Sequence, residues 1–126
     1  MQLDHVQLAM PAGAEDQARA FFGDLLRMTE ETKPEPLRSR GGCWFRSGMC
    51  VVHVGVDPDF HPQSKAHPAF VVNDFDELAA RLESSDHPVR RDQSLGGVDR
   101  LYTDDPFGNR IEFIRRGHGF SEPRDG

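Results

Sequence analysis

The sequence predicts an α+β protein made of two βαβββ modules in succession. Two segments about sixty residues apart are alike, because residues 3–10 (LDHVQLAM) and 65–72 (KAHPAFVV) both combine strand-like apolar residues with an early histidine. Each segment precedes an amphipathic helical pattern, and each helical pattern precedes further β-rich sequence. A repeat of this kind indicates two copies of one supersecondary unit.

In the first module, about residues 2–56, the strand at 3–10 is followed by a helix over 15–26, whose apolar residues recur on one face. Residues 29–41 are charged and rich in proline, which predicts a loop bordering a site. Two short apolar runs, 43–46 and 50–56, predict a hairpin.

The hairpin is expected to turn at Ser47-Gly48. With the turn centred there, Cys50 would lie opposite Phe45 and not opposite Cys43. Free thiols are therefore expected, and the spacing of the two cysteines is not that of a zinc finger.

The second module, about residues 65–116, repeats the order. Asp74 with Glu77 three residues later predicts a capping box at the start of a helix. The helix places Phe75, Leu78 and Leu82 on one face. The remaining predicted segments are the linker 57–64, strands at 66–72, 89–91, 100–103 and 110–115, a turn at 104–109, and a disordered tail at 117–126.

Composition narrows the function classes. The formal charge of −6 disfavours nucleic acid and anionic membranes as partners, because phosphates require a basic excess. No apolar run approaches the ~20 residues of a membrane span. The N-terminus lacks signal-peptide features, so we expect one cytoplasmic domain over residues 1–126 that acts on a small molecule.

Strand alternation groups the candidate metal ligands. His53 is on the other face of its strand from Val52 and Val54, and Glu112 is on the other face of its strand from Ile111 and Phe113. If the apolar faces pack on the helices, the other faces make a cup. The residues expected to line it are His5, His53, His67 and Glu112. Imidazole and carboxylate ligands with open positions suit a divalent metal that also binds substrate.

A single strand histidine or glutamate is more often a surface residue than a ligand; the matched positions across the repeat favour ligation by His5, His67 and Glu112. His53 could ligate, line the pocket, or act as an acid or base. The other three histidines, His61, His87 and His118, are expected to face solvent.

The opening Leu-Asp-His-Val, the Asp-Pro-Phe-Gly-Asn turn and the Ile-Glu-Phe that follows resemble the vicinal oxygen chelate superfamily over about residues 2–116. That group includes glyoxalase I, extradiol dioxygenases, fosfomycin-resistance thiol transferases and bleomycin-resistance proteins. The resemblance implies that the modules pair into an open, cup-shaped mixed β-barrel around one divalent metal ion per site (Fe, Mn, Ni or Zn). By position, His5, His67 and Glu112 match the superfamily's ligands, and His53 matches the fourth ligand position.

The resemblance implies a metal-dependent, glyoxalase-like lyase or isomerase whose substrate chelates the metal through vicinal oxygens. A ring-cleaving dioxygenase and a thiol transferase are the alternatives within the enzyme class. In glyoxalase I the fourth position is usually a glutamate that transfers protons, and His53 departs from that pattern. Glu112 and His53 are the expected catalytic residues. The expected pocket residues are Gln7, Trp44, Arg46 and Tyr102, with Arg100 as a further candidate.

The alternative outside the enzyme class is a protein that sequesters an antibiotic-like small molecule without catalysis, with Trp44 and Phe45 as stacking surfaces. Bleomycin-binding members lack the metal ligands, so the intact set favours the enzyme. Members of the superfamily exchange modules, which leads us to expect a homodimer whose ligands can come from two chains.

Overall fold

The computed structural model describes residues 1–122. The chain divides into two compact units, Met1–Pro62 with Pro106–Asn109, and Gln63–Asp105 with the chain from Arg110. Each unit contains one four-stranded sheet. Among the residues described, no helix has the length and apolar character needed to cross a membrane.

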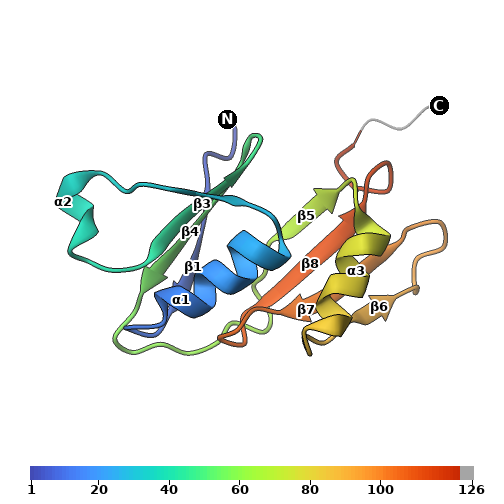
Figure 1. The fold of residues 1–126 in the computed structure, drawn as a ribbon. Helices are drawn as coiled ribbons and strands as arrows, with labels where there is room; N and C mark the ends of the chain where they lie inside the picture. The colour runs from blue at the N-terminus through green and yellow to red at the C-terminus, as the bar shows by residue number, and fades with distance from the viewer. Residues whose placement is uncertain (123–126) are drawn as a thin grey trace. The chain divides into compact units, whose positions relative to one another are not determined.

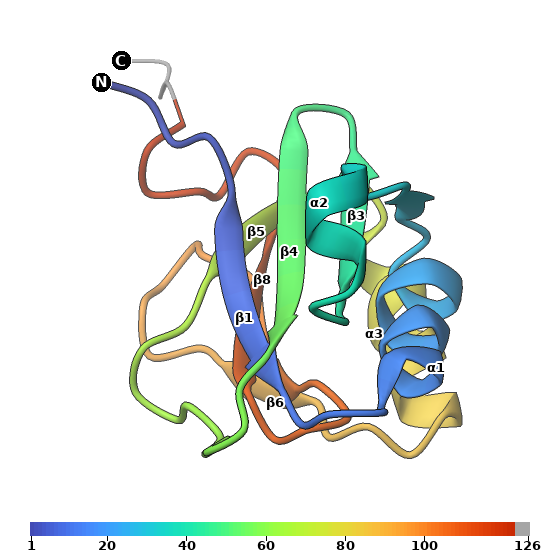
Figure 2. The same cartoon turned by 90° about the vertical axis from the view of Figure 1, so that its left-hand side faces the viewer.

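The first unit contains a mixed sheet with the strand order β1-β4-β3-β2. β1 runs parallel to β4, and the other two pairs are antiparallel. Figure 2 shows β1, β4 and β3 side by side. The elements in chain order are β1 (Val6–Met10), α1 (Glu15–Ala18), the π-helix η1 (Arg19–Leu25), β2 (Thr29–Glu31), α2 (Glu35–Arg38), β3 (Cys43–Ser47) and β4 (Cys50–Val56).

The second unit contains a sheet of equivalent topology, β5-β8-β7-β6, in which β5 is parallel to β8 (Figure 1). Its elements are β5 (Ala69–Val72), α3 (Phe75–Ser84), β6 (Arg90–Asp92), β7 (Arg100–Asp104) and β8 (Arg110–Arg115). In both units the first strand pairs in parallel with the last, and a helical segment follows the first strand. The α+β class and the βαβββ repeat are therefore confirmed.

One face of the first sheet forms its core. Phe45 of β3 is buried together with Val52 and Val54 of β4, and Phe22 of η1 stacks on Phe45 with ring centroids 5.4 Å apart. Because side chains alternate along a strand, Trp44 and His53 point to the other face. The predicted alternation of β4 is thus correct.

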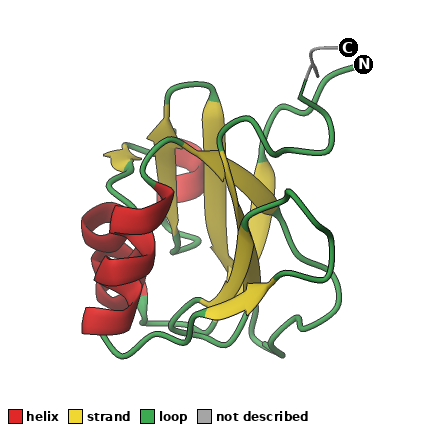
Figure 3. Ribbon diagram, turned by 90° about the vertical axis from the view of Figure 1, so that its right-hand side faces the viewer, coloured by secondary structure: helices red, strands yellow, loops and turns green. Residues whose placement is uncertain are grey.

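The core of the second unit has the same design. Phe75, Leu78 and Leu82 of α3 are buried, as are Ile111 and Phe113 of β8. In Figure 1, α3 lies along β8, and Figure 3 draws the helices in red and the strands in yellow. Glu112 lies between Ile111 and Phe113 and therefore projects from the opposite face.

The first predicted strand is too long at its start. β1 begins at Val6, where pairing with Val52 of β4 starts, and Leu3 is 84% exposed. The predicted strand at 66–72 is likewise shortened, because β5 begins at Ala69 just after Pro68. Consequently His5 and His67 each precede a strand instead of lying within it.

Two predictions for the middle of the first module are also corrected. The segment 29–41 is not only a loop, since it contains β2 and α2. The helix predicted over 15–26 changes from α to π at Arg19, and the N–H of Leu26 bonds to the carbonyl of Phe21, five residues earlier.

The hairpin turns one residue later than predicted. Ser47 pairs with Cys50, so the turn residues are Gly48 and Met49. Gly48 has φ of 60°, a conformation that suits glycine at the first position of a two-residue turn. Cys50 is therefore not opposite Phe45, which pairs with Val52. Both cysteines are free, as expected.

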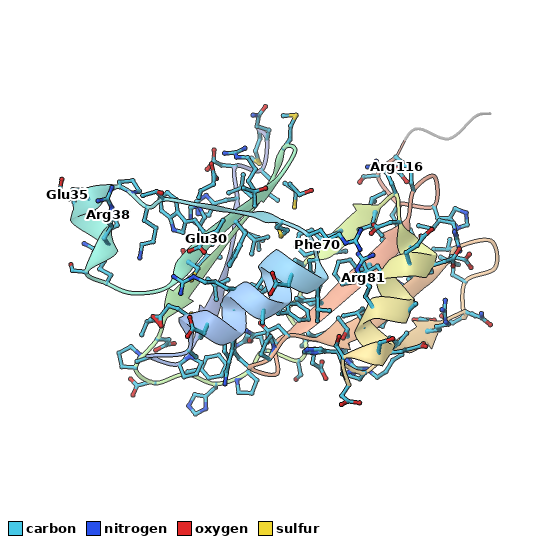
Figure 4. The ribbon with its side chains drawn as sticks, viewed as in Figure 1. Glu30, Glu35, Arg38, Phe70, Arg81 and Arg116 are labelled. Carbon is cyan, nitrogen blue, oxygen red and sulfur yellow. The ribbon has the colours of Figure 1, made fainter. Side chains whose placement is uncertain are left out.

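Asp74 occupies the N-cap position of α3, but its side chain makes no cap hydrogen bond, so the predicted capping box is absent. Its carboxylate instead accepts a hydrogen bond from Nη2 of Arg81 at 2.7 Å. Figure 4 shows Arg81 on α3. The Asp74 carboxylate thus bonds to the Arg81 guanidinium and not to the backbone N–H groups at the start of α3.

The segment after β8 folds back as hydrogen-bonded turns as far as Glu122, whereas disorder was predicted from residue 117. The Glu122 carboxylate accepts hydrogen bonds from the backbone N–H groups of Gly117 and Gly119, at 2.9 and 2.7 Å. The rest of the predicted tail, residues 123–126, lies outside the described residues.

Candidate functional site

In the second unit, His67 faces Glu112. Nε2 of His67 lies 3.0 Å from Oε1 of Glu112, and Nδ1 of His67 lies 2.8 Å from the carbonyl oxygen of Lys65. A carbonyl only accepts hydrogen bonds, so Nδ1 carries a hydrogen, and the contact of Nε2 with the carboxylate requires a proton or a metal ion between the two atoms. The two side chains are 23% and 5% exposed, which makes this a partly desolvated pair.

The sheet register places this pair. Glu112 sits in β8 between Ala69 of β5 and Tyr102 of β7. The backbone N–H of Glu112 donates to the carbonyl of Pro68 at 3.0 Å. That bond holds the segment with His67 against the strand that carries the carboxylate.

Arg100 approaches the other oxygen of the same carboxylate. Its Nη1 lies 3.4 Å from Oε2 of Glu112, and its Nη2 lies 3.0 Å from Oδ2 of Asp92. Tyr102 meets the His67 ring edge-on with centroids 5.5 Å apart, and the guanidinium carbon of Arg110 lies 4.9 Å from the Tyr102 ring centre. The buried carboxylate therefore has one partner at each oxygen.

The first unit presents a row of aromatic rings. Gln7, His53 and Trp44 are register partners across β1, β4 and β3, so they share one face of the sheet. The Trp44 ring stacks on His53 with centroids 3.9 Å apart and an interplanar angle of 1°. His5 stacks on His53 at 4.1 Å. His53 is thus held between two rings.

The two histidines of this stack, His53 in the middle and His5 at one end, differ in their electrostatic surroundings. Burial, reinforced by the neighbouring His5, lowers the pKa of His53 below its ordinary value. The imidazole is therefore neutral near pH 7 and can accept a proton or bind a metal. Asp4 lies beside Nδ1 of His5 at 2.8 Å, and this hydrogen bond lowers the pKa of the Asp4 carboxyl.

The stack borders a pocket of about 760 Å³. Arg46 and Glu31 line it as an ion pair, with Nε and Oε1 3.1 Å apart. Gln7 also lines it, and its side chain lies over Gly55, where a Cβ would collide with it. Trp44 is part of the wall, but Phe45 faces the core and cannot stack on a ligand here, so that part of the prediction is wrong.

The four predicted ligands occur as two pairs, each within its own unit: His5 with His53, and His67 with Glu112. Over residues 1–122, no group of three or more His, Cys, Asp or Glu side chains is placed to hold a metal. The donor atoms of the second pair nevertheless fit adjacent ligand positions. Two donors bound at roughly 2.1 Å and at right angles stand about 3 Å apart.

The other histidines are only partly as predicted. His61 is exposed. Nδ1 of His87 lies 3.2 Å from the carbonyl oxygen of Asp104, and Nδ1 of His118 accepts a hydrogen bond from the N–H of Asp99 at 2.8 Å. Neither of these two simply faces solvent. His118 lies in the segment that was predicted to be disordered, so no periodicity could have revealed its partner.

Sequence reasoning missed two contacts of the candidate site. It named Arg100 as a pocket candidate but not as a partner of Glu112, and it gave Asp4 no role beside His5. The register of β7 against β8 would have suggested the first, because Arg100 pairs with Ile114, two residues beyond Glu112 on the same face. The second contact joins adjacent residues and leaves no sequence signal of its own.

The sequence model of the Glyoxalase/Bleomycin resistance protein/Dioxygenase superfamily matches residues 2–113. Among solved structures, a protein from Bacillus anthracis described as a glyoxalase family protein is 47% identical, with a TM-score of 0.87 over 91% of this chain and 94% of that one. This match bears out the predicted fold class.

More distant structures share the fold. The fosfomycin resistance protein FosX from Listeria monocytogenes is 14% identical, with a TM-score of 0.74 over 91% of this chain and 93% of that one. Lactoylglutathione lyase from Agrobacterium tumefaciens is 20% identical, with a TM-score of 0.64 over 88% of this chain and 92% of that one. A search of curated proteins found no match.

Proposed function

Because the chain belongs to the Glyoxalase/Bleomycin resistance protein/Dioxygenase superfamily, we propose that it is a divalent-metal-dependent enzyme of the glyoxalase-like type. Its reaction would be a lyase or isomerase step on a small substrate with vicinal oxygens. The residues proposed to hold the metal are His5, His67 and Glu112, with His53 as a fourth ligand or as a proton acceptor.

The observation that carries this proposal is the orientation of His67. Its Nδ1–H is engaged by the Lys65 carbonyl, which turns Nε2 toward Glu112 at 3.0 Å. Two acceptor atoms at that distance repel each other unless a proton or a metal ion lies between them. A backbone carbonyl that fixes the tautomer is also the usual outer partner of a metal-binding histidine.

A bound divalent metal would supply Lewis acidity that stabilises negative charge on the substrate oxygens. The chain's own residues would do the rest. Glu112 is held in place by its neighbours on both oxygens, and the neutral His53 can take a proton from the substrate at an imidazole nitrogen. Trp44 and Arg46 line the pocket that would exclude water around the substrate.

Metal content tests the proposal. Protein purified without chelator, or reloaded with Mn, Fe, Ni or Zn, is expected to hold about one metal ion per site. His67→Ala should lose it, because one donor of the second pair is gone. His61→Ala is the matched control, since that histidine is exposed, and it should keep the metal. A wild type that holds none of the four metals would contradict the proposal.

One observation favours a second candidate, a protein that sequesters an antibiotic-like molecule. The pocket of about 760 Å³ beside the Trp44–His53 stack is large enough for a drug-sized ligand. Trp44 is the chain's only tryptophan, so its fluorescence reports on the pocket directly. Tight quenching by bleomycin in the presence of a chelator would support sequestration, and binding that requires metal would oppose it.

A homodimer remains part of the proposal, with ligand pairs from two chains forming one site. Light scattering should give twice the chain mass of 14.2 kDa. Co-expressed His5→Ala and His67→Ala chains should then recover metal in the mixed dimer, because one of its two sites would keep every ligand. If the mixed dimer recovers no metal, all ligands of a site come from a single chain.

A further inference from the structure

We infer that Arg100 is a positioning residue for Glu112. Its guanidinium contacts Oε2 of the carboxylate and so keeps Oε1 turned toward His67. The inference rests on the proposed metal-binding role of Glu112 and adds to it a residue that does not itself touch metal or substrate.

The first observation is the division of the carboxylate between two partners. Oε1 faces His67 Nε2 at 3.0 Å, and Oε2 faces Arg100 Nη1 at 3.4 Å. The guanidinium uses part of the acceptor capacity of Oε2 and its positive charge repels a metal ion there, which leaves Oε1 the more favourable oxygen for a metal. Arg100 would therefore favour ligation through one oxygen and keep coordination positions open for substrate.

The second observation is that Arg100 is itself held from several sides. Its Nη2 bonds to Asp92 at 3.0 Å. Its guanidinium carbon lies 5.8 Å from the ring centre of Tyr102 and 5.5 Å from that of Phe120. Phe120 comes from the turn that Glu122 closes, and Arg116 beside that turn bonds to Glu122 at 3.1 Å (Figure 4).

The third observation is an unsatisfied atom. Nε of Arg100 is buried and has no hydrogen-bond partner within the described chain. Arg100 thus makes its polar contacts through its two terminal nitrogens, which bridge Asp92 and Glu112. A buried N–H left without a partner is unfavourable, which implies that the bridge outweighs that loss. A lysine has one ammonium group in place of this fork and cannot reproduce the bridge.

Whether metal affinity rises or falls when Arg100 is replaced distinguishes a positioning role from a purely electrostatic one. Removing a positive charge next to a ligand would strengthen metal binding by electrostatics alone. Loss of an orienting partner in the second coordination shell instead weakens metal binding by roughly 10- to 100-fold. The two explanations predict opposite changes for the same substitution.

The experiment measures the Mn²⁺ dissociation constant by calorimetry for wild type, Arg100→Met, Arg100→Lys and Asp92→Asn. We expect affinity to fall about tenfold or more in all three variants, including Asp92→Asn, whose residue does not contact Glu112. Arg90→Met is the matched control, because Arg90 pairs with Asp104 on the same sheet, and its affinity should be unchanged. Unchanged or tighter binding by Arg100→Met and Asp92→Asn would overturn the inference.

A measurement on metal-free protein tests the role of Arg100 independently of the proposed function. Crystal structures of chelator-treated wild type and Asp92→Asn would show whether the Glu112 carboxylate turns away from His67 when the bridge is broken. A wild type that binds neither Mn²⁺ nor Fe²⁺, Ni²⁺ or Zn²⁺ would contradict the proposed function alone. In that case a Glu112 that stays in place in Asp92→Asn would overturn the positioning role, and one that rotates would support it.

Discussion

Asn109 donates a hydrogen bond from Nδ2 to the carbonyl oxygen of Ala9 at 2.8 Å, across a separation of 100 residues. Its side chain is buried, and the turn that carries it, Pro106–Asn109, belongs to the first compact unit. Sequence reasoning treated Asn109 as a turn former. The structure adds the role of tying that turn to the end of β1.

The first prediction concerns this bond. Asn109→Ala should lower the free energy of unfolding by about 1–3 kcal/mol, because it removes a part-buried hydrogen bond to the Ala9 carbonyl. Asn73→Ala is the control. The Asn73 side chain bonds to Arg116 at an exposed site, so its loss should change stability by no more than about 0.5 kcal/mol. Urea unfolding measures both, and equal effects would show that the Asn109 bond contributes nothing specific.

The second prediction concerns Glu112. In chelator-treated protein, Glu112→Ala should lower the free energy of unfolding by about 3 kcal/mol, because Arg100 and His67 lose a buried partner. Glu83→Ala on the exposed side of α3 should change it by less than about 0.5 kcal/mol. If Glu112→Ala were as stable as wild type in urea, the carboxylate would not be stabilised by its neighbours in the metal-free protein.

The third prediction concerns the thiols. Burial raises the pKa of both Cys43 and Cys50, so little reactive thiolate exists near pH 7. Cys43 is 1% exposed, whereas Cys50 is only partly buried. Iodoacetamide should therefore modify Cys50 first, and Cys43 only when the first unit opens. Peptide mass spectrometry checks the order, and faster labelling of Cys43 would contradict the packing of β3.

The fourth prediction concerns pH. Backbone N–H groups of the closing turn, together with Arg116, lower the pKa of Glu122. A carboxyl whose pKa is lowered on folding stabilises the turn above its unfolded value of about 4.3 and loses that contribution as pH falls through the folded value. The turn should therefore stay closed at pH 5 and open only at pH values below that unfolded value.

Amide NMR measures this opening. The Gly117 and Gly119 resonances should shift together in the acid range, and in Glu122→Gln they should be insensitive to pH there. Resonances that titrate only above the ordinary carboxyl range would assign the effect to a group other than Glu122.

The elements that were predicted well have strong periodicity. β8 was predicted with its observed bounds, and α3 with its observed buried face, because apolar residues recur there at the period of a strand or a helix. The predicted alternation places His53 and Glu112 on the face opposite to that of their apolar neighbours. It follows from the two-residue period of a strand alone, and it is correct.

The features that were missed depend on partners that the hydrophobic pattern does not reveal. β2 is a three-residue strand of Thr and Glu, with no apolar alternation, and only its pairing with β3 makes it a strand. The Asp74 cap fails because Arg81 takes its carboxylate. Likewise, the bridge of Arg100 to Asp92 and Glu112 depends on the register of three strands, which one sequence does not specify.

The central claim is that His67 and Glu112 bind a divalent metal, and pulsed EPR of Mn²⁺-loaded protein tests it most directly. With ¹⁵N-labelled histidine, the spectrum should show coupling to imidazole nitrogen, lost together with the bound metal in His67→Ala and unchanged in His61→Ala. Coupling that survives intact in His67→Ala, or a wild-type spectrum of aqueous Mn²⁺ alone, would contradict the claim.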